Sequence, residues 1–336
     1  MAPTPDNPTA EVVELASAYV LARAVQAAAR FGVADYLADG PKSAQDLARL
    51  TGTDHVKLAR LMRALTGAGI FTEDASDRFA LTPRGDALRS DALDSARAAV
   101  LLLGSPYMWS AFEDLPNLLT NSNEPGRERR RLFSDIAADP VSAARLSEGM
   151  TGFTRREAAA VAEAYDCSGL RVIADVGGND GHLLTTLLLA WPGPKGVLYD
   201  LPHVLPAARR VIADRALADR CEIVTGSFFE AVPTGADAYI LSHVLHDWPE
   251  PECLTVLRNI RRAMQRDGRL LIVEYVIPDR NVPHLSWHYD LILLATTDGR
   301  ERTVEEYAAL LGQAGFRVER VVPTRLDVSV IEAVPV

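Results

Sequence analysis

The sequence predicts an α/β protein, in which a doubly wound, mostly parallel sheet with an antiparallel edge hairpin follows an N-terminal, mostly helical winged-helix-like domain. Two observations predict this fold class. From Leu170 onward, short apolar runs alternate with helical segments, which is typical of buried parallel strands joined by helices. Between residues 14 and 95, by contrast, helical segments precede two short strands, which is the order of a winged helix.

The N-terminal segments follow from local signals. Residues 1–13 are polar, and we expect them to form a disordered lead-in. An amphipathic helix follows and is closed by Gly32. The next long helix has Ser43 as its N-cap and Gly52 as its stop signal. After one more helix, GIFTEDASDRFALTP predicts two strands around an Asp/Ser turn.

A winged helix can bind DNA or can pack against a second copy of the chain. Between Lys42 and Asp91, eight basic residues are balanced by seven acidic ones, and the formal net charge of the whole chain is -10. Because a DNA-binding module needs a local excess of positive charge, we expect no nucleic-acid partner. We expect a homodimer instead, formed through the long apolar helix at residues 14–31.

The remaining segments predict a connector and a sheet domain. Residues 96–168 are predicted to be helical, with a polar break at TNSNEPGRERRR, and residues 169–336 form the sheet domain. Its parallel strands are RVIADV, GVLYD, EIVTG, DAYILS and RLLIVEY. FRVERVV and DVSVIEAV have only a turn between them, so we expect an antiparallel pair at the sheet edge.

Cysteine usage and hydropathy indicate the compartment. Cys167, Cys221 and Cys253 are widely spaced and form no CxxC pair, which favours reduced thiols over disulfides or a zinc site. The N-terminus lacks the basic segment of a secretory signal, and no stretch reaches the roughly 18 uninterrupted apolar residues of a membrane span. We therefore expect a cytoplasmic protein with no membrane partner.

The segment VIADVGGNDGHLLTTLLLA predicts a site for a nucleotide-like cofactor. Its strand ends at Asp175, and Gly177, Gly178 and Gly181 let the turn approach a ligand and expose amides at a helix N-terminus. Asp200 ends the next strand, where a carboxylate can accept hydrogen bonds from ribose hydroxyls. The glycine spacing differs from G-x-G-x-x-G, which weakens the alternative of a nicotinamide dinucleotide.

Histidines and acids occur where later strands end. Ser242, His243 and His246 follow YIL, Glu274 lies at the end of RLLIVEY, and Glu301 lies in TTDGRERT. Because ligands bind beyond the carboxyl ends of parallel strands, we expect these side chains to face one crevice, with His243 as the lesser candidate for a base. We see no compact cluster of oxygen ligands at this edge, so we expect no metal ion.

The motifs DVGGNDG, YDLPHV, GSFF, LHDW and GRERT, in this order and spacing, resemble those of the plant-type O-methyltransferases. That family includes enzymes acting on caffeic acid and acetylserotonin and has bacterial antibiotic-tailoring relatives. The resemblance covers essentially the whole chain. It implies a Rossmann-like methyltransferase sheet that binds S-adenosylmethionine (SAM) in residues 169–336, and a substrate pocket lined by residues 96–168. It also implies methyl transfer from SAM to a hydroxyl of a small, aromatic acceptor.

The resemblance implies the catalytic residues. The histidine before Asp-Trp is the family's general base and corresponds to His246, and the two orienting acids correspond to Glu274 and Glu301. A histidine with an ordinary pKa near 6.5 is neutral enough at pH 7 to accept a proton, and a carboxylate can fix its tautomer. Both acids have alternative interpretations, because Glu301 could be an exposed loop acid and Glu274 a capping residue.

The resemblance also implies binding residues, with Asp200 on the ribose and Phe228 on the adenine. Those expected to bind SAM are Asp175, Gly177, Gly178, Gly181, Asp200, Leu201, Ser227, Phe228, Ser242 and Thr154. Those expected to bind the acceptor are Trp109, Leu146, Met150, Trp248, Leu293 and Thr297. Each acceptor residue could instead belong to the ordinary core.

Three residues depart from the family pattern. Asn179 stands where a third glycine is usual. Ser227 replaces a common aspartate near the adenine, and Ser242 replaces a lysine of the plant members. These departures concern adenine recognition more than the identity of the cofactor.

Several alternatives remain open. The same scaffold is similar to tailoring enzymes that bind SAM without transferring its methyl group, and N-methylation of an amine is another outcome. Two further alternatives belong to other functional classes. They are a DNA-binding regulator that senses a small ligand and a nicotinamide-dependent oxidoreductase. The presence of His246, Glu274 and Glu301 favours O-methylation, because the steps without methyl transfer need no such base.

Overall fold

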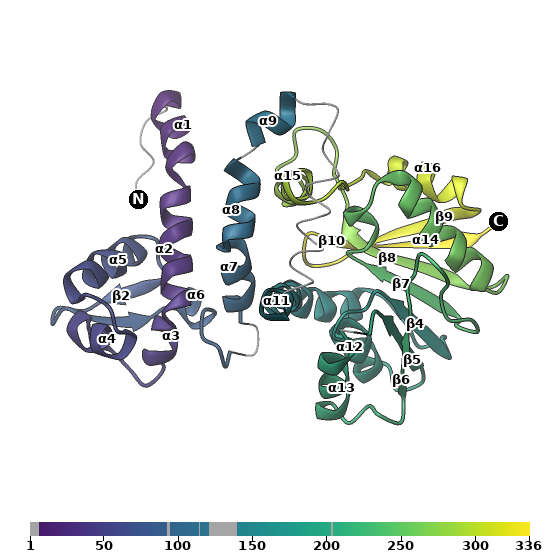
Figure 1. Cartoon of the computed structure of the whole chain (residues 1–336), viewed down its shortest axis with the longest axis horizontal. Coiled ribbons are helices and arrows are strands. Elements are labelled where there is room, and N and C mark those ends of the chain that lie inside the picture. The colour runs from purple at the N-terminus through teal and green to yellow at the C-terminus, as the bar shows by residue number, and fades with distance from the viewer. Residues whose placement is uncertain (1–6, 93–94, 114, 121–139, 203) are drawn as a thin grey trace. The chain divides into compact units, whose positions relative to one another are not determined.

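The computed structural model describes residues 7–92, 95–113, 115–120, 140–202 and 204–336, and the chain divides into two compact units (Figure 1). The first unit comprises Met1–Trp109 with Glu148–Gly152, and the second comprises Ser110–Ser147 with Phe153–Val336. The boundary falls inside the expected connector of residues 96–168, which therefore contributes helices to both units instead of forming a segment of its own.

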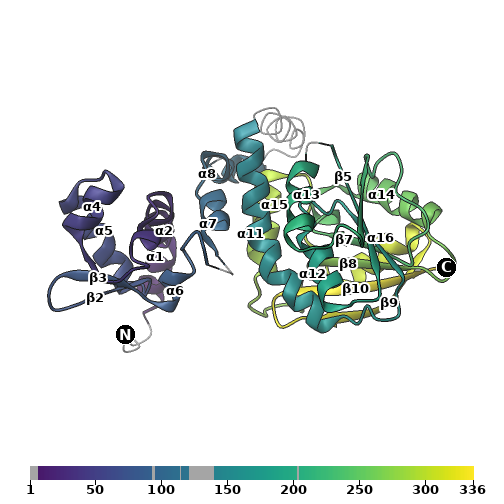
Figure 2. The same cartoon turned by 90° about the horizontal axis from the view of Figure 1, so that it is seen from below.

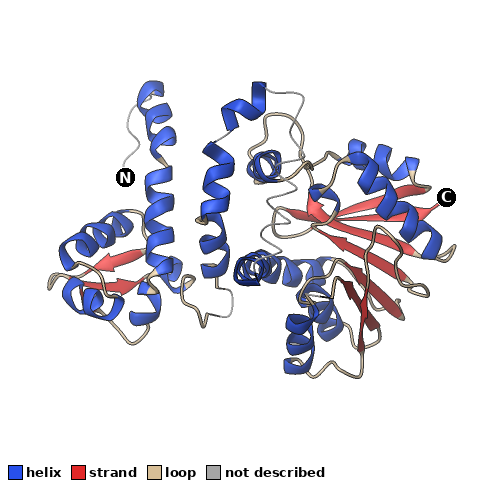
Figure 3. Cartoon of the chain, in the orientation of Figure 1, coloured by secondary structure: helices blue, strands red, loops and turns tan. Residues whose placement is uncertain are grey.

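The first unit is mostly helical with a small sheet (Figure 3). Its elements are α1 (Pro8–Ser17), α2 (Tyr19–Arg30), α3 (Val33–Tyr36), β1 (Lys42–Ser43), α4 (Ala44–Thr51), α5 (His55–Gly67), β2 (Phe71–Glu73), β3 (Arg78–Leu81), α6 (Pro83–Asp86) and α7 (Arg97–Leu103). The predicted winged-helix order is confirmed, since α3, α4 and α5 precede the hairpin of β2 and β3. Strand β1 adds a third member, in the order β1-β3-β2.

The helix boundaries of this unit follow the predicted signals. The Ser43 hydroxyl accepts a hydrogen bond from the amide of Asp46 at 3.1 Å, which caps the start of α4. Gly52 ends the same helix with φ +68°, a left-handed conformation that glycine adopts without strain. The buried side chains of Leu47, Met62 and Phe71 then pack α4, α5 and β2 into one core.

The expectation of a disordered lead-in at residues 1–13 is wrong from Pro8 onward. Asn7 accepts a hydrogen bond from the amide of Ala10 at 3.3 Å and Pro8 opens α1, so capping and a proline at the first position start the helix earlier. The run Pro8–Arg30 is long and apolar enough to cross a membrane by length and composition, with 17% of its most apolar window buried. Exposed apolar side chains, such as those of Leu15 and Val20, contribute to the high hydropathy of this run.

The expected connector is mostly helical in the part of it that the structure describes. Beyond α7 its helices are α8 (Pro106–Glu113), α9 (Leu115–Thr120) and α11 (Pro140–Ala164). Residues 121–131 of the predicted polar break lie outside the described residues. Within the first unit, a side chain at Gly152 of α11 would come within 3.1 Å of the backbone of Ala99, so the missing side chain lets α11 approach α7 closely.

The second unit is built on a seven-stranded sheet in the order β6-β5-β4-β7-β8-β10-β9. Its strands are β4 (Val172–Val176), β5 (Lys195–Asp200), β6 (Cys221–Thr225), β7 (Ala238–Ser242), β8 (Arg269–Tyr275), β9 (Phe316–Pro323) and β10 (Val328–Pro335). The first five are parallel, while β10 pairs antiparallel with both β8 and β9, which confirms the predicted parallel sheet and edge hairpin. The strand order reverses between β4 and β7, where α/β proteins bind ligands.

Helices cover both faces of this sheet: α12 (His182–Ala190), α13 (Leu205–Asp214), α14 (Glu250–Ala263), α15 (Ser286–Thr296) and α16 (Val304–Gln313). In Figure 2, α11, α12 and α13 lie on one side of the sheet and α14 and α16 on the other. Successive residues of β4 alternate between two cores, since Ile173 packs in a cluster with Leu184, and Ala174 packs in a cluster with Leu257. Burial on both faces explains why the central strands β4 and β7 are almost entirely apolar.

Candidate active site

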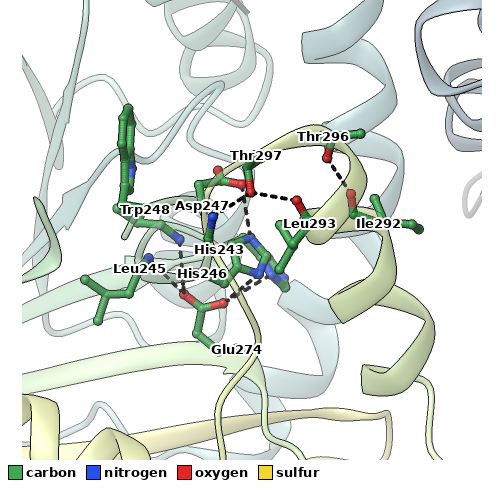
Figure 4. Close-up of polar contacts among 12 residues, drawn as sticks. His243, Leu245, His246, Asp247, Trp248, Glu274, Ile292, Leu293, Thr296 and Thr297 are labelled. Carbon is green, nitrogen blue, oxygen red and sulfur yellow. Dashed lines mark hydrogen bonds and ion pairs between the residues drawn. The ribbon is translucent and has the colours of Figure 1, made fainter. Parts of the chain in front are cut away.

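The turn after β7 carries His246 and is fixed through its amides by one carboxylate. The short 3-10 helix η1 (Leu245–Asp247) follows Val244. The Oε1 atom of Glu274 accepts hydrogen bonds from the amides of Val244, Leu245 and His246 at 3.2, 3.1 and 3.4 Å (Figure 4). Glu274 lies in β8, the neighbouring strand, and its side chain is fully buried. The capping interpretation of Glu274 is therefore confirmed for one of its two oxygens.

The carbonyl groups of the same turn are held from the opposite side. The thiol of Cys253 and the guanidinium of Arg302 both donate to the carbonyl of Leu245, at 3.1 and 3.2 Å. Gly299 lies directly against the turn, because a Cβ atom at this position would come within 1.7 Å of the carbonyl oxygen of His246. Buried groups thus satisfy both ends of the turn, which leaves His246 little freedom to move.

The imidazole of His246 is buried and oriented by Glu301. Its Nδ1 atom lies 2.9 Å from Oε1 of Glu301 with hydrogen-bond geometry. Oε2 of Glu274 is 3.0 Å from the same nitrogen, yet it lies off the N–H direction and accepts no hydrogen bond in the described part of the chain. Glu301 is 1% exposed, which contradicts the alternative of an exposed loop acid. The Nδ1–H therefore donates to Glu301.

The second ring nitrogen of His246 has no hydrogen-bond partner among the described residues. The nearest carboxylate oxygen to it is Oδ1 of Asp247 at 3.8 Å, which is beyond hydrogen-bond distance. With the proton on Nδ1, the lone pair of Nε2 is available to accept a proton from a ligand.

The protonation of His246 differs from the sequence expectation of an ordinary pKa. Burial lowers its pKa, but the charges of Glu274 and Glu301 outweigh burial and raise the pKa of His246 to about 10. Burial also raises the pKa of Glu274. The imidazole of His246 and the carboxyl of Glu274 therefore titrate together, and in the chain without a bound cation His246 is an imidazolium at neutral pH.

A second histidine, His243, lies behind the first. Its Nε2 atom is 2.6 Å from Oε2 of Glu157 in α11, and its Nδ1 atom is 3.8 Å from Oε2 of Glu274. The hydroxyl of Tyr275 donates to Oε1 of Glu157 at 2.5 Å. The rings of His243 and His246 are 5.1 Å apart. His243 thus belongs to the same buried polar cluster as the three predicted catalytic residues.

Close spacing of three potential ligands raises the question of a metal ion. Nitrogen atoms of His243 and His246 and an oxygen of Glu274 lie within 4.8 Å of one another. However, one ring nitrogen of each histidine contacts a carboxylate at hydrogen-bond distance, Nε2 in His243 and Nδ1 in His246, and a nitrogen that donates a proton has no lone pair for a metal. These side chains form a hydrogen-bonded cluster, and the absence of a metal stays a prediction.

The glycine turn after β4 has the backbone of a close-approach site. Gly177 has φ +75°, and a Cβ atom there would lie 3.0 Å from Val244 and 3.4 Å from Phe228. Asn179 has φ +51°, a conformation that asparagine tolerates, which explains how it can replace the family's third glycine. Both carboxylate oxygens of Asp175 are buried without a hydrogen-bond partner in the described chain, and burial followed by the charge of Asp200 raises the pKa of Asp175 to about 7.

Asp200 lies beside this turn, at the tip of β5. Its two carboxylate oxygens accept hydrogen bonds from the amides of Asn179 and Leu201, at 2.8 and 2.6 Å. A carboxylate at a strand tip is the type of group that can accept hydrogen bonds from ligand hydroxyls. Leu201 itself is 43% exposed.

An aromatic cluster follows β6. Phe228 and Phe229 pack edge to face with ring centres 4.7 Å apart, and the indole of Trp248 packs on Phe229 at 4.7 Å. Ser227 accepts a hydrogen bond from the amide of Phe229 at 3.3 Å. In Figure 4 the indole of Trp248 points away from His246 and Leu293. The structure thus places Trp248 beside the expected adenine residue, away from the other expected acceptor residues of this unit.

The remaining predicted binding residues are not all brought together. Leu293 and Thr297 lie at the end of α15, where the Thr297 hydroxyl donates to the carbonyl of Leu293 at 3.2 Å. Ser242 ends β7, and Thr154 lies in α11. Trp109 and Met150 belong to the first unit, where the Arg23 guanidinium lies 4.6 Å above the Trp109 ring. The side chain of Leu146 lies outside the described residues.

Sequence reasoning missed several residues of the site. They are Glu157, Cys253, Tyr275, Gly299 and Arg302. Glu157 and Tyr275 carry no signal of their own, because they contact each other across 118 positions. Arg302 and Gly299 could have been found from the GRERT segment, whose glycine and arginine flank the predicted Glu301.

Family models match both parts of the chain. A model described as O-methyltransferase domain matches residues 119–317, and a model described as O-methyltransferase dimerisation domain matches residues 13–91. Together they cover the sheet domain and the winged-helix-like domain.

Curated relatives match over nearly the whole length. A phenazine O-methyltransferase of Lysobacter antibioticus is 36% identical over 326 residues, which are 97% of this chain and 96% of that protein. An 8-amino-8-demethylriboflavin N,N-dimethyltransferase of Streptomyces davaonensis is 35% identical over 327 residues, covering 95% and 92% of the two chains. The relatives thus include enzymes that methylate oxygen and enzymes that methylate nitrogen.

A solved structure matches equally well. The methyltransferase of calicheamicin biosynthesis, solved with bound S-adenosylhomocysteine, superposes with a TM-score of 0.87 at 36% identity. The match covers 99% of this chain and all of that one.

Proposed function

Since the chain belongs to the SAM-dependent O-methyltransferase family of secondary-metabolite tailoring enzymes, we propose that it methylates a hydroxyl of a small, aromatic acceptor with His246 as general base. The observation that carries the proposal is the asymmetry of this buried imidazole. Nδ1 is held by Glu301 at 2.9 Å, while Nε2 has no hydrogen-bond partner in the described chain. Such a ring accepts a proton at one defined atom.

The acceptor's proton is the group that the protein must move. When a methyl group is transferred to the acceptor oxygen, the O–H bond of the acceptor must break, and Nε2 of His246 would take that proton. Glu301 stabilises the resulting imidazolium through the Nδ1–H hydrogen bond, and the charge of Glu274 adds to this. A positioned base of this kind contributes roughly 10²–10⁴-fold to the rate.

The residues of the second unit fit SAM as the bound cofactor. SAM supplies a methyl group on a cationic sulfonium, so the leaving sulfur needs no protonation. A Cβ atom at Gly177 would meet Val244, so the turn is a close-approach backbone at the strand tip, and Asp200 supplies a carboxylate of the type that binds ribose hydroxyls. We assign the adenine to Phe228 and, on the basis of their packing, also to Trp248.

The positive charge of SAM also affects the pKa of His246. An imidazolium disfavours a second cation nearby, so bound SAM would lower the pKa of His246 from its value of about 10. His246 then loses its resting proton as the cofactor binds and becomes a base only when the methyl donor is present.

The acceptor side of the proposal rests on Leu293 and Thr297 in this unit, with Trp109, Leu146 and Met150 as further candidates. Because the relatives include phenazine and riboflavin-type methyltransferases, we propose a planar aromatic acceptor. We also propose a homodimer through the exposed apolar side chains of α1 and α2, which fall partly within the matched dimerisation domain.

Transfer of a labelled methyl group from SAM to a panel of phenols and aromatic amines tests the proposed function. We expect label in a phenol, with one methyl group on oxygen. Label found only in amines would replace O-methylation by the N-methylation known for one relative. Tight SAM binding with no label in any acceptor would contradict methyl transfer.

A further inference from the structure

Behind the proposed base lies a second histidine–carboxylate pair that the reaction does not use. Nε2 of His243 and Oε2 of Glu157 are 2.6 Å apart, and both side chains are more than nine-tenths buried. Tyr275 donates to the other oxygen of Glu157 at 2.5 Å, so the carboxylate accepts two short hydrogen bonds. This environment stabilises an ionised Glu157 and a protonated His243.

The pair adjoins a carboxylate oxygen of the catalytic cluster that accepts no hydrogen bond in the described chain. Oε2 of Glu274 is buried without a donor, as is Oε2 of Glu301, and the Nδ1 atom of His243 lies 3.8 Å away from the Glu274 oxygen. A buried anionic oxygen without a donor needs a nearby positive charge. His243 provides such a charge, whereas Glu301 accepts the Nδ1–H hydrogen bond of His246.

His243 also holds an uncommon backbone conformation. Its φ of +53° lies in the left-handed region, which histidine adopts only occasionally and at a cost in free energy. This conformation comes directly after β7, where the chain leaves the sheet and turns toward His246. The fold thus holds the His243 ring 5.1 Å from the His246 ring, at the price of local strain.

We propose that Glu157 holds His243 as a fixed imidazolium, and that this charge lowers the proton affinity of His246, so that the binding of cationic SAM can release its proton. His243 is then a positioning residue that acts through charge, and its role rests on the proposed function of His246. Two positive charges about 5 Å apart repel each other, so a proton binds His246 less readily while His243 is charged.

Other charged and titratable groups surround the two rings and act in different directions. These are Glu157 of α11, Asp247 of η1, Glu274 and Tyr275 of β8, Tyr289 of α15, and Glu301 and Arg302 before α16. The anions raise the pKa of His246, whereas a charged His243, whose ring lies 5.1 Å away, opposes them. Neutralising His243 therefore moves the pKa of His246 upward, by about two pH units at an effective dielectric near 20.

Two variants neutralise His243 in different ways. His243→Gln removes the imidazole, and Glu157→Gln keeps the hydrogen bond but removes the carboxylate that holds the second proton. Tyr275→Phe is the matched control, because it removes a hydroxyl from the same cluster and leaves the ion pair in place. Binding of S-adenosylhomocysteine, measured by calorimetry, verifies that each full-length variant is folded.

The test measures the pKa of His246 directly, by NMR titration of its ring nitrogens in the cofactor-free protein, with His246→Gln providing the assignment. We expect the pKa of His246 to rise by about one unit or more in His243→Gln and in Glu157→Gln, and by less than about 0.3 units in Tyr275→Phe. An unchanged or lower pKa in Glu157→Gln would overturn the proposal. The pKa of His246 is measured without turnover. The test therefore distinguishes two failures: that His243 does not change this pKa, and that His246 does not act as the general base.

Discussion

Nδ1 of His246 lies 2.9 Å from Oε1 of Glu301, although 55 positions separate the two residues in the chain. The hydrogen bond brings a loop before α16 against the turn after β7, and Gly299 completes the contact. It fixes which nitrogen of the ring carries the proton. The reactivity of the other nitrogen therefore depends on a residue that does not touch the acceptor.

Replacing Glu301 by glutamine tests this dependence. The negative charge of Glu301 raises the pKa of His246, so Glu301→Gln should lower that pKa and shift the rise of kcat/KM with pH toward lower pH. The maximal kcat should fall by about 10²-fold, because the imidazolium formed in the reaction loses its partner. Glu305→Gln, on the exposed face of α16, is the control and should leave both quantities unchanged. If kcat/KM of Glu301→Gln rises at the same pH as in the unaltered protein, or at a higher pH, the assignment of Glu301 as the partner of His246 would be contradicted.

Proton release on cofactor binding tests the coupling between His246 and the sulfonium charge. With a pKa of about 10, His246 is protonated in the cofactor-free chain at pH 7.5. Binding of cationic SAM should therefore release up to one proton more than binding of neutral S-adenosylhomocysteine, and SAM affinity should increase as pH rises. Calorimetry in two buffers of different ionisation enthalpy measures the difference. Equal release with both ligands would show that the cofactor does not deprotonate His246.

Gly299→Ala should displace the catalytic turn without touching the cofactor residues. The added methyl group would meet the carbonyl oxygen of His246, so the turn must shift. A displacement of about 1 Å at a catalytic group can reduce turnover by about 10²-fold, and we expect a loss of at least 10-fold with little change in the affinity for S-adenosylhomocysteine. Gly312→Ala is matched to it, since a methyl group there meets no atom within 4 Å. Equal activity of the two variants would argue against this contact.

Asp200→Asn should weaken cofactor binding and spare the chemistry. Hydrogen bonds to a charged acceptor contribute about 1.5–3 kcal/mol, so Kd for S-adenosylhomocysteine should rise about 10- to 100-fold. At saturating SAM, kcat should change little. The exposed Asp219 provides the control substitution Asp219→Asn. A normal Kd in Asp200→Asn would remove this carboxylate from the cofactor site.

The sequence predicted those parts of the site that lie at strand ends. Asp200 and Glu274 end apolar runs, and the edge of a parallel sheet gathers such residues whatever the loops do. The winged-helix order and the edge hairpin were also predictable, because each depends on patterns within about 20 residues. Helix α1 was missed because its polar first turn hides the capping signal of Asn7.

The supporting residues could not be predicted in the same way. Glu157 meets His243 across 86 positions, and nothing in the sequence around Glu157 distinguishes it from a solvated helix residue. The raised pKa of His246 likewise depends on two buried carboxylates converging on one nitrogen. Such properties arise only when distant elements pack together.

The most direct test of the central claim is turnover by His246→Gln at saturating SAM and acceptor, with Kd for S-adenosylhomocysteine measured on the same sample. We predict that kcat falls by about 10²-fold or more while Kd stays within about twofold of that of the unaltered protein. The exposed histidine variant His55→Gln should retain full turnover. Undiminished kcat in His246→Gln would contradict the role of His246 as general base.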